Sequence, residues 1–342
     1  MQKRALFEVH HGTDLPELDS SPRASKKVSI GLPVFNGERY LEQSLESILS
    51  QTYGNFELII SDNASTDGTE EICRRYAARD ARVRYHRNPR NHGATFNFRR
   101  VALLSSGEYF LWAAHDDIFA PEYVERCVAV LEQNRDVVLC YSKSIEIDEQ
   151  GHPLECNEHT LNADAPYPHQ RFRELIRMDH NCEAMFGVMR AAVVKRTSIH
   201  GDFPDSDRCM LAEVALHGEF HEQRDRLFFH RKHGLQVTRQ FPSRQERMAR
   251  VNPDRRFLIV FPHFRQFWEY ILAIQRSPVN WKERLRCYHL MLRWLVDNRA
   301  RLARDLRYAV GQLAQPFRLR WRRWRRSSAT HVPDHTVQKC KP

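Results

Sequence analysis

Hydrophobic positions in the first half of the chain alternate between short apolar runs and amphipathic stretches. The runs predict buried strands at residues 28–34, 56–60, 82–86, 109–113 and 137–141. Between them, apolar residues recur at helical spacing, as they do from residue 37 to residue 50. Strands and helices that alternate in this way predict βαβ units around a mainly parallel sheet flanked by helices. We therefore expect an α/β fold.

The pattern changes in the second half, where regularity weakens after Gly151 and helical spacing dominates beyond residue 245. Periodic apolar residues there predict helices at 257–275, 280–298 and 300–314. Together with a polar start and an arginine-rich end, these changes divide the chain into four parts. We expect a flexible leader at 1–26, an α/β domain at 27–240, a helical extension at 241–315 and a basic amphipathic tail at 316–342.

An excess of basic residues favours partners that carry phosphate. Lys and Arg number 53 against 43 Asp and Glu, which gives a net charge of +10. Six arginines lie between Arg318 and Arg326, so the rest of the chain is only mildly basic. The eight cysteines are scattered without a CxxC pair, which predicts reduced thiols in a reducing compartment. We find neither a signal-peptide pattern nor about 18 consecutive apolar residues, so we expect a cytoplasmic protein.

Polar residues follow three of the predicted strands at the point where each strand ends. They are Pro33, Phe35 and Asn36 after the first, Asp62 and Asn63 after the second, and Asp116 and Asp117 after the 109–113 strand. The carboxyl ends of parallel strands meet at one edge of a sheet, where α/β proteins bind ligands. These residues could together hold a base, a ribose and a metal-bound diphosphate. Any one of them, taken alone, could instead be a turn residue or a helix cap.

The opening segments resemble the amino-terminal signature of the family 2 glycosyltransferases. The resemblance is carried by residues 28–41, 44–52 and 56–69, which include the strand ends just described. It is dense over residues 27–150 and thinner to about residue 240. It implies the Rossmann-like GT-A fold, a nucleotide-sugar donor (UDP-, GDP- or dTDP-linked), a divalent Mn²⁺ or Mg²⁺ ion and transfer with inversion.

The resemblance also implies which residues bind the nucleotide. Pro33, Phe35 and Asn36 match the element that borders it, and the ring of Phe35 can stack on a base. Asp62 matches the acid that accepts a hydrogen bond from the base, and Asn63 lies beside it. A further match places Asn91 and Gly93 near the nucleotide.

The expected metal site departs from the family pattern at one position. Ala114 stands where the family usually has the first acid of an Asp-x-Asp-Asp motif, and Asp116 matches the usual direct ligand. The resemblance adds Asp117 as a supporting ligand, His233 as a ligand through a ring nitrogen, and Arg231 as a phosphate contact that also borders the nucleotide. Alternatively, Asp116 and Asp117 cap the helix that begins near Pro121, and Arg231 and His233 lie in an exposed basic loop.

A second motif supplies a candidate catalytic base. Inverting transfer needs a carboxylate that takes the proton of the acceptor hydroxyl. The family places this base at the start of a helix, where Asp207 matches, while Ser206 replaces the usual glutamate. Asp205 is the substitute candidate, and helix capping is the alternative for both residues.

The basic tail has aromatic residues on one helical face. Phe317, Trp321 and Trp324 are spaced four and three residues apart, among the arginines of residues 316–326. Such a helix can lie peripherally on the inner face of an anionic membrane. Alternatively, the aromatic residues pack on the protein and the arginines are simply solvated.

The sequence thus predicts a hexosyltransferase-type enzyme that moves a sugar to a glycan or lipid-linked acceptor hydroxyl, in the synthesis of a polysaccharide or glycolipid. A dehydrogenase would need a Gly-x-Gly-x-x-Gly turn that is not found after the first strand. A nucleic-acid-binding protein would spread its basic residues over a face, and a pyrophosphorylase would need a Gly-rich basic loop. A degenerate nucleotide-sugar-binding protein remains the main alternative, because of Ala114 and Ser206.

Overall fold

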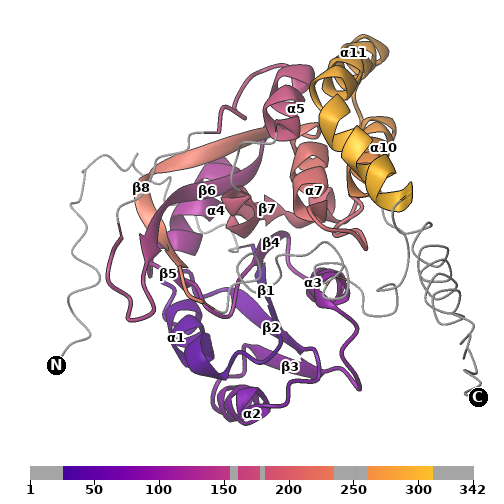
Figure 1. Ribbon diagram of the computed structural model, residues 1–342. Coiled ribbons are helices and arrows are strands. Elements are labelled where there is room, and N and C mark those ends of the chain that lie inside the picture. Colours follow the sequence, from indigo (N-terminus) through magenta and orange to yellow (C-terminus); the bar gives the residue numbers. More distant parts are fainter. Residues whose placement is uncertain (1–25, 155–160, 178–181, 235–250, 252–260, 311–342) are drawn as a thin grey trace, which may run out of the picture.

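A computed structural model describes residues 26–154, 161–177, 182–234, 251 and 261–310 (Figure 1). The predicted leader, apart from residue 26, and the predicted tail lie outside the described residues. The described chain forms one eight-stranded sheet in the order β3-β2-β1-β4-β7-β6-β8-β5. Its strands are β1 (Val28–Val34), β2 (Phe56–Asp62), β3 (Val83–Arg87), β4 (Tyr109–Trp112), β5 (Ile118–Phe119), β6 (Val137–Ile147), β7 (Val188–Arg190) and β8 (Glu219–Arg231).

The first four strands of the chain, β1 to β4, form the parallel half of the sheet. β1 pairs in parallel with β2 on one side and with β4 on the other, and β2 continues to β3. The chain therefore proceeds outward from β1 through β2 to β3, and then crosses to the other side of β1 to form β4. The strand order thus reverses between β1 and β4, which is the topological switch point where α/β sheets bind ligands. Every residue of β1 and β2 is buried, as expected for strands covered by helices on both faces. The predicted mainly parallel α/β fold is confirmed.

The other strands complete the sheet through β8, a strand that the sequence analysis missed. β8 is parallel to β6 and antiparallel to the two-residue β5, while β7 joins β4 and β6 in antiparallel pairing. The first part of β8 is partly exposed and charged, and only its last part, Leu227–Arg231, contains a buried apolar run. This mixture hides the alternation that marks a half-buried strand.

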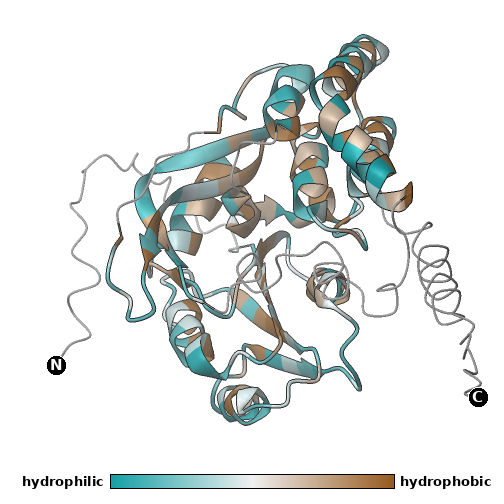
Figure 2. Cartoon of the chain, viewed as in Figure 1, coloured by the Kyte–Doolittle hydropathy of each residue, from teal (hydrophilic) through white to brown (hydrophobic). Residues whose placement is uncertain are grey.

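Helices cover both faces of the sheet and enclose two cores. They are α1 (Glu38–Leu49), α2 (Thr69–Arg79), α3 (Ala94–Leu103), α4 (Tyr123–Gln133), α5 (Pro168–Ile176), the short η1 (Glu183–Phe186) and α6 (Ala191–Val194), α7 (Ser206–Ala215), α10 (Pro262–Arg276) and α11 (Trp281–Asp297). Residues 299–310 are also helical. One core lies under α1, α2 and α4, and the other under α3, α5, α7, α10 and α11. Figure 2 shows the hydrophobic strands between these layers.

Helix α7 is held by charged residues from its neighbours. The buried carboxylate of Glu213 accepts hydrogen bonds from Arg276 of α10 at 2.7 and 2.9 Å. At the other end, Arg171 of α5 donates to the carbonyl of Ala215 at 2.8 Å. Gly218 follows this helix, and its φ is not positive. Glycine is required there because a Cβ would lie 2.5 Å from the carbonyl oxygen of Asp136.

The amino ends of the strands are held by a buried glutamate on β2. Glu57 accepts hydrogen bonds from the hydroxyls of Ser29 and Ser106 at 2.7 Å, and Arg84 bonds its other oxygen at 2.7 Å. Burial alone would raise the pKa of Glu57, but these hydrogen bonds outweigh it and lower the pKa from 4.5 to about 2. The folded state therefore favours the charged form of Glu57.

A pH-dependent contribution to stability follows from this lowered pKa. A carboxyl group with a depressed folded-state pKa stabilises the protein above its unfolded pKa of 4.5 and loses that effect as the pH falls toward 2. We expect Glu57→Gln to lower the free energy of unfolding by about 2–3 kcal/mol at neutral pH. Chemical denaturation of both proteins should show this difference shrinking between these two pH values. A difference that stays constant over that range would contradict the assignment.

Candidate active site

The loops after β1 and β4 touch at the carboxyl edge of the sheet. Gly31 of β1 lies opposite Trp112, the last residue of β4, and β1 continues in parallel to Val34, so both strands lead to the same edge of the sheet. A Cβ placed on Gly37 would lie 2.6 Å from the ring of His115, which shows how closely the two loops approach. The residues that follow β1 and the acids that follow β4 therefore share one side of the molecule.

Asp116, in the loop after β4, contacts His233. The Nε2 atom of His233 lies 2.8 Å from Oδ2 of Asp116, although 117 residues separate them. The pairing of β5 with β8, Ile118 opposite Phe229, brings the two segments together. The His233 ring is buried and packs 4.8 Å from the ring of Tyr40 on α1. Neither Asp116 nor Asp117 caps α4, because β5 lies between these acids and the helix.

The two neighbouring acids, Asp116 and Asp117, have pKa values shifted in opposite directions. Burial acts to raise the pKa of Asp116, but the charges of His115 and His233 beside it hold that pKa below its usual range. Burial raises the pKa of Asp117, and the charge of Asp116 adds to this effect. Asp116 is therefore the better anion and the better ligand for a cation.

Asp116 and His233 are side chains of the kind that can bind a divalent cation. Asp117 instead makes contacts with the end of β8. Oδ1 of Asp117 accepts the backbone N–H of Arg231 at 2.9 Å, and its carboxylate lies 3.2 Å from Nδ1 of His230. No group of three His, Cys, Asp or Glu side chains within the described residues forms a metal cluster. A cation on Asp116 and His233 would thus need oxygens from a ligand or water, whereas Asp117 anchors the end of β8.

The structure corrects the expectation for Arg231, which was a phosphate contact bordering the nucleotide. Its side chain is fully buried, and its guanidinium donates to the backbone carbonyls of Asp116, Asp148 and Glu149. It also donates to Gln43 at 2.7 Å. These bonds tie the turn after β4, the turn after β6 and α1 together. Arg231 is a structural element of the site, and the segment is not an exposed basic loop.

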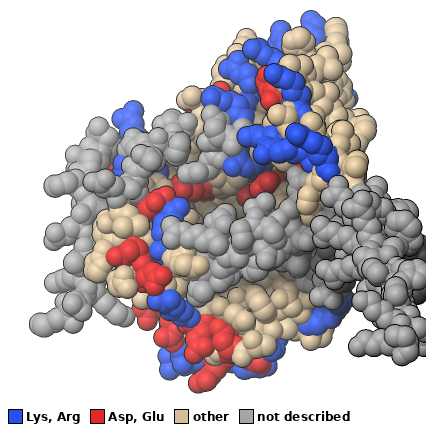
Figure 3. Space-filling view, viewed as in Figure 1, with Lys and Arg blue, Asp and Glu red and all other residues tan. Residues whose placement is uncertain are grey.

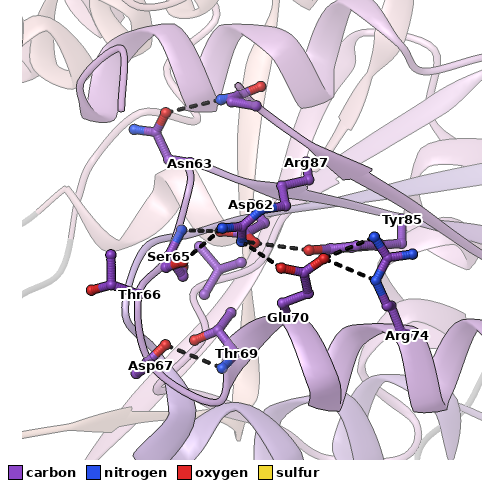
Figure 4. A network of polar contacts seen from close by, with 12 residues as sticks. Asp62, Asn63, Ser65, Thr66, Asp67, Thr69, Glu70, Arg74, Tyr85 and Arg87 are labelled. Atoms are coloured by element: carbon purple, nitrogen blue, oxygen red, sulfur yellow. Dashed lines mark hydrogen bonds and ion pairs between the residues drawn. The ribbon is translucent and has the colours of Figure 1, made fainter. Parts of the chain in front are cut away.

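Asp62 is the centre of a polar network at the carboxyl end of β2 (Figure 4). Its Oδ1 accepts the backbone N–H of Ser65 at 2.8 Å, and its Oδ2 accepts from Tyr85 at 2.8 Å and Arg87 at 2.6 Å. The carboxylate is fully buried. These bonds hold the turn that contains Ala64, whose positive φ of 61° is unfavourable for a residue with a Cβ. These bonds leave one acceptor position on Oδ1, and the buried carboxylate would have to become accessible before a base could use it.

The structure also corrects the role expected for Asn63. Its amide donates to Asn91 Oδ1 and to the carbonyl of Gly93, and its oxygen accepts from Asn88 and from the backbone of His92. Both donors and both acceptor positions are therefore occupied, which leaves none for a nucleotide. Asn63 instead fixes residues 88–93, where Gly93 has a φ of 91° that favours glycine. Asn91 lies on the same loop and is half-buried.

The residues after β1 differ in their access to solvent. Pro33 is buried within β1 opposite Ser61. Phe35 is 40% exposed, so part of its side chain is accessible to a ligand. Asn36 has a φ of 52°; its side-chain oxygen accepts the backbone N–H of Thr66 at 2.8 Å, and its own backbone N–H donates to Ser65 Oγ at 2.9 Å. Phe35 is the residue of this group that can stack on a base.

The two candidate bases lie at the start of α7. Asp205 precedes the helix with a φ of 63°, and its side chain makes no capping hydrogen bond, while Asp207 is in the first turn. The adjacent Ser206 lies 3.3 Å from Nδ1 of the buried His200, whose ring packs against Trp112 at the end of β4. The start of α7 therefore lies beside the strand that leads to Asp116.

Three residues of this region were missed by the sequence analysis. Arg87 is the last residue of β3 and binds Asp62, so a search for polar residues at the end of this strand would have found it. Tyr40 was counted only as an apolar helix position, yet its ring contacts His233 and lies 4.8 Å from the Arg231 guanidinium. His200 gave no signal, because only the fold brings it between Ser206 and Trp112.

Comparison with solved structures defines the class of fold. The chain is similar to residues 1–349 of S. aureus TarS in complex with UDP-GlcNAc, with a TM-score of 0.59, 16% identity, and coverage of 84% of this chain and 81% of that TarS chain. The same TarS residues in complex with UDP give a TM-score of 0.54 over 75% of this chain and 68% of the TarS chain, at 15% identity. The described part of the chain thus has the GT-A-like α/β fold that the sequence predicted.

The family follows from the sequence match. Residues 29–196 match the model of glycosyl transferase family 2, which identifies this region as a family 2 domain. It is 37% identical over 126 residues to the putative glycosyltransferase EpsE of Bacillus subtilis, and 34% identical over 116 residues to the glycosyltransferase GlyG of Streptococcus pneumoniae. These matches cover 36% and 34% of this chain. The chain spans under half the length of these relatives, 45% of EpsE and 38% of GlyG.

The buried guanidinium of Arg231 leads to a stability prediction. We expect Arg231→Met to lower the free energy of unfolding by about 2–4 kcal/mol, because it leaves several buried carbonyls without donors. Arg39 is a matched control, since it also lies over the Tyr40 ring but is an exposed surface residue. Arg39→Met should change stability by less than about 0.5 kcal/mol in urea denaturation. Equal stability of both variants would contradict the structural role.

Proposed function

We propose that the chain transfers a sugar from a nucleotide-sugar donor to a hydroxyl of a glycan or lipid-linked acceptor, with inversion. The observation that carries the proposal is the 2.8 Å contact between Asp116 and His233 at the carboxyl edge of a family 2 domain. It joins a carboxylate and an imidazole beside the loop that presents Phe35. Such a pair, on a sheet of this topology, suits a metal-bound diphosphate.

The nucleotide would lie between the ends of β1, β2 and β4. Phe35 offers a ring for stacking, and the Asp62 network offers one acceptor position to a base. UDP is the first nucleotide to test, because the TarS complexes of similar fold were solved with UDP and with UDP-GlcNAc. GDP and dTDP remain candidates, since likeness of fold does not determine the base.

Asp116 and His233 would hold a Mn²⁺ or Mg²⁺ ion, whose charge would neutralise the diphosphate as it leaves. The protein residues would then perform the remaining tasks. Asp207, or Asp205 in its place, accepts the proton of the acceptor hydroxyl as that oxygen attacks the anomeric carbon. Attack from the face opposite the diphosphate inverts the anomeric centre. The proton ends on the carboxylate, and the bonding pair of the broken C–O bond leaves with the diphosphate.

A nucleotide-sugar-binding protein without transfer activity is the second candidate. It is favoured by Ala114 and Ser206, which replace acids of the family pattern, and by the engagement of Asp117 with β8. We also retain the proposals of a cytoplasmic location, a role in polysaccharide or glycolipid synthesis, and an anionic membrane partner for residues 316–326. That segment lies outside the described residues. Among the described helices, none has the length and hydropathy needed to cross a membrane.

Ligand-dependent thermal stability tests the donor site first. We expect one nucleotide among UDP, GDP, dTDP and CMP to raise the melting temperature, and Mn²⁺ to increase the shift, because a ligand that binds only the folded state stabilises it. At 100 times its dissociation constant the stabilisation is about 2.7 kcal/mol. His233→Ala should remove the part of the shift that depends on Mn²⁺. No shift with any nucleotide, with or without metal, would contradict the proposed donor site.

Turnover of the sugar nucleotide separates transfer from binding alone. We expect Asp116→Asn and Asp207→Asn each to lower transfer by about 100-fold or more, because each removes a group that acts on the reacting atoms. Only Asp116→Asn should also weaken metal-dependent nucleotide binding. Asp297→Asn, at an exposed acid on α11, is the control and should keep wild-type activity. Near-normal turnover by Asp207→Asn together with loss in Asp205→Asn would move the base to Asp205. Near-normal turnover by all variants would contradict the mechanism.

A further inference from the structure

Helix α11 has two apolar faces, and only one of them is covered. Cys287, Met291 and Trp294 point into the core shared with α5 and α10. A second set lies at intervals of four, seven and four residues, which places its members on one side of a helix. This exposed stripe consists of Trp281, Leu285, Leu292 and Val296, each between 58 and 67% exposed. Ordinary surface helices bury their single apolar face, so the stripe indicates a partner.

The surroundings of the stripe are strongly basic. Lys282, Arg286 and Arg293 are exposed on α11, and the described residues 262–310 contain ten Lys and Arg against four Asp and Glu. Three of these acids, Glu269, Glu283 and Asp305, are buried and engaged with basic side chains or histidines. Asp297 is the exposed acid among these residues. Figure 3 shows Lys and Arg gathered over the region of α5, α10 and α11, next to uncharged surface.

Charge complementarity distinguishes between the possible occupants. A second copy packed on the same stripe would bring the basic flanks of two α11 helices together. The arginine-rich residues 318–326 of this chain would likewise meet Lys282, Arg286 and Arg293 with like charge. An anionic lipid surface instead attracts the flanks and accepts Trp and Leu side chains at its interface.

We propose that the exposed stripe and basic flank of α11 dock the protein on an anionic lipid surface. Trp281, Leu285, Leu292 and Val296 enter the boundary between headgroups and acyl chains. Lys282, Arg286 and Arg293 lie among the lipid phosphates. The proposal extends the membrane partner proposed for residues 316–326 but rests on different residues, and it does not depend on sugar transfer.

Vesicle co-sedimentation with the full chain tests this proposal. Vesicles of phosphatidylcholine with about one third phosphatidylglycerol should bind the protein, and pure phosphatidylcholine should bind it much less. We expect Leu292→Asp to weaken vesicle binding about tenfold or more, because it removes an apolar side chain that would enter the lipid and adds a negative charge. Leu103→Asp on α3 is the matched control, since Leu103 and Leu292 are 63 and 64% exposed. The control should bind like the wild type.

Two further variants separate the stripe from the terminal segment. Replacing Lys282, Arg286 and Arg293 together with Gln should reduce the preference for anionic vesicles, and an unchanged preference would contradict the role of the basic flank. The variant Trp321→Ser/Trp324→Ser tests residues 316–326 separately. Loss of binding in that variant, with wild-type binding by Leu292→Asp, would overturn the proposal for α11. A dimer in sedimentation velocity that Leu292→Asp dissociates, without vesicle binding, would also overturn it and assign the stripe to a second copy.

Discussion

The pairing of β8 with β5 and β6 is the constraint on which the site depends. It returns the chain, after more than 80 residues, to the turn that follows β4. There Asp117 holds the backbone of Arg231, Arg231 holds the carbonyl of Asp116, and His233 reaches the Asp116 carboxylate. Because these contacts come from Arg231 at the end of β8 and from His233 two residues later, a small displacement of β8 would disturb all of them. The carboxylate–imidazole pair is thus positioned by the sheet itself.

A second network fixes the other side of the site with neutral groups. Asn97 of α3 donates to the carbonyls of Val34 and Ser61, and Asn63 holds the loop that follows β3. These amides are buried, and the bonds they make replace those that water would provide. Residues at the strand ends therefore serve two purposes. The buried amides hold the surrounding loops in place, and Phe35 remains accessible to a ligand.

The sequence predicted the fold better than it predicted the contacts of each residue at the candidate site. Apolar runs and helical spacing located the strands of the parallel half-sheet, and the resemblance brought Asp116 and His233 into one site. The sequence could not show that Arg231 and Asn63 are fully engaged inside the protein, because hydrogen-bond partners depend on contacts between distant segments. The same limit hid β8, whose charged first half lacks a strand pattern, and His200, whose neighbours come from other elements.

The ion pair between Glu213 and Arg276 has an implication for how this chain could change over time. The fully buried carboxylate of Glu213 in α7 is paired with Arg276 of α10, a helix that follows residue 260. An ancestor that exchanged its carboxyl-terminal helices for others would have left that carboxylate unpaired inside the core, at a loss of several kcal/mol. The pair therefore disfavours replacement of the carboxyl-terminal helices by unrelated ones. Divergence in this lineage should proceed by substitutions on the outer surfaces of α10 and α11 while their inner surfaces remain constant.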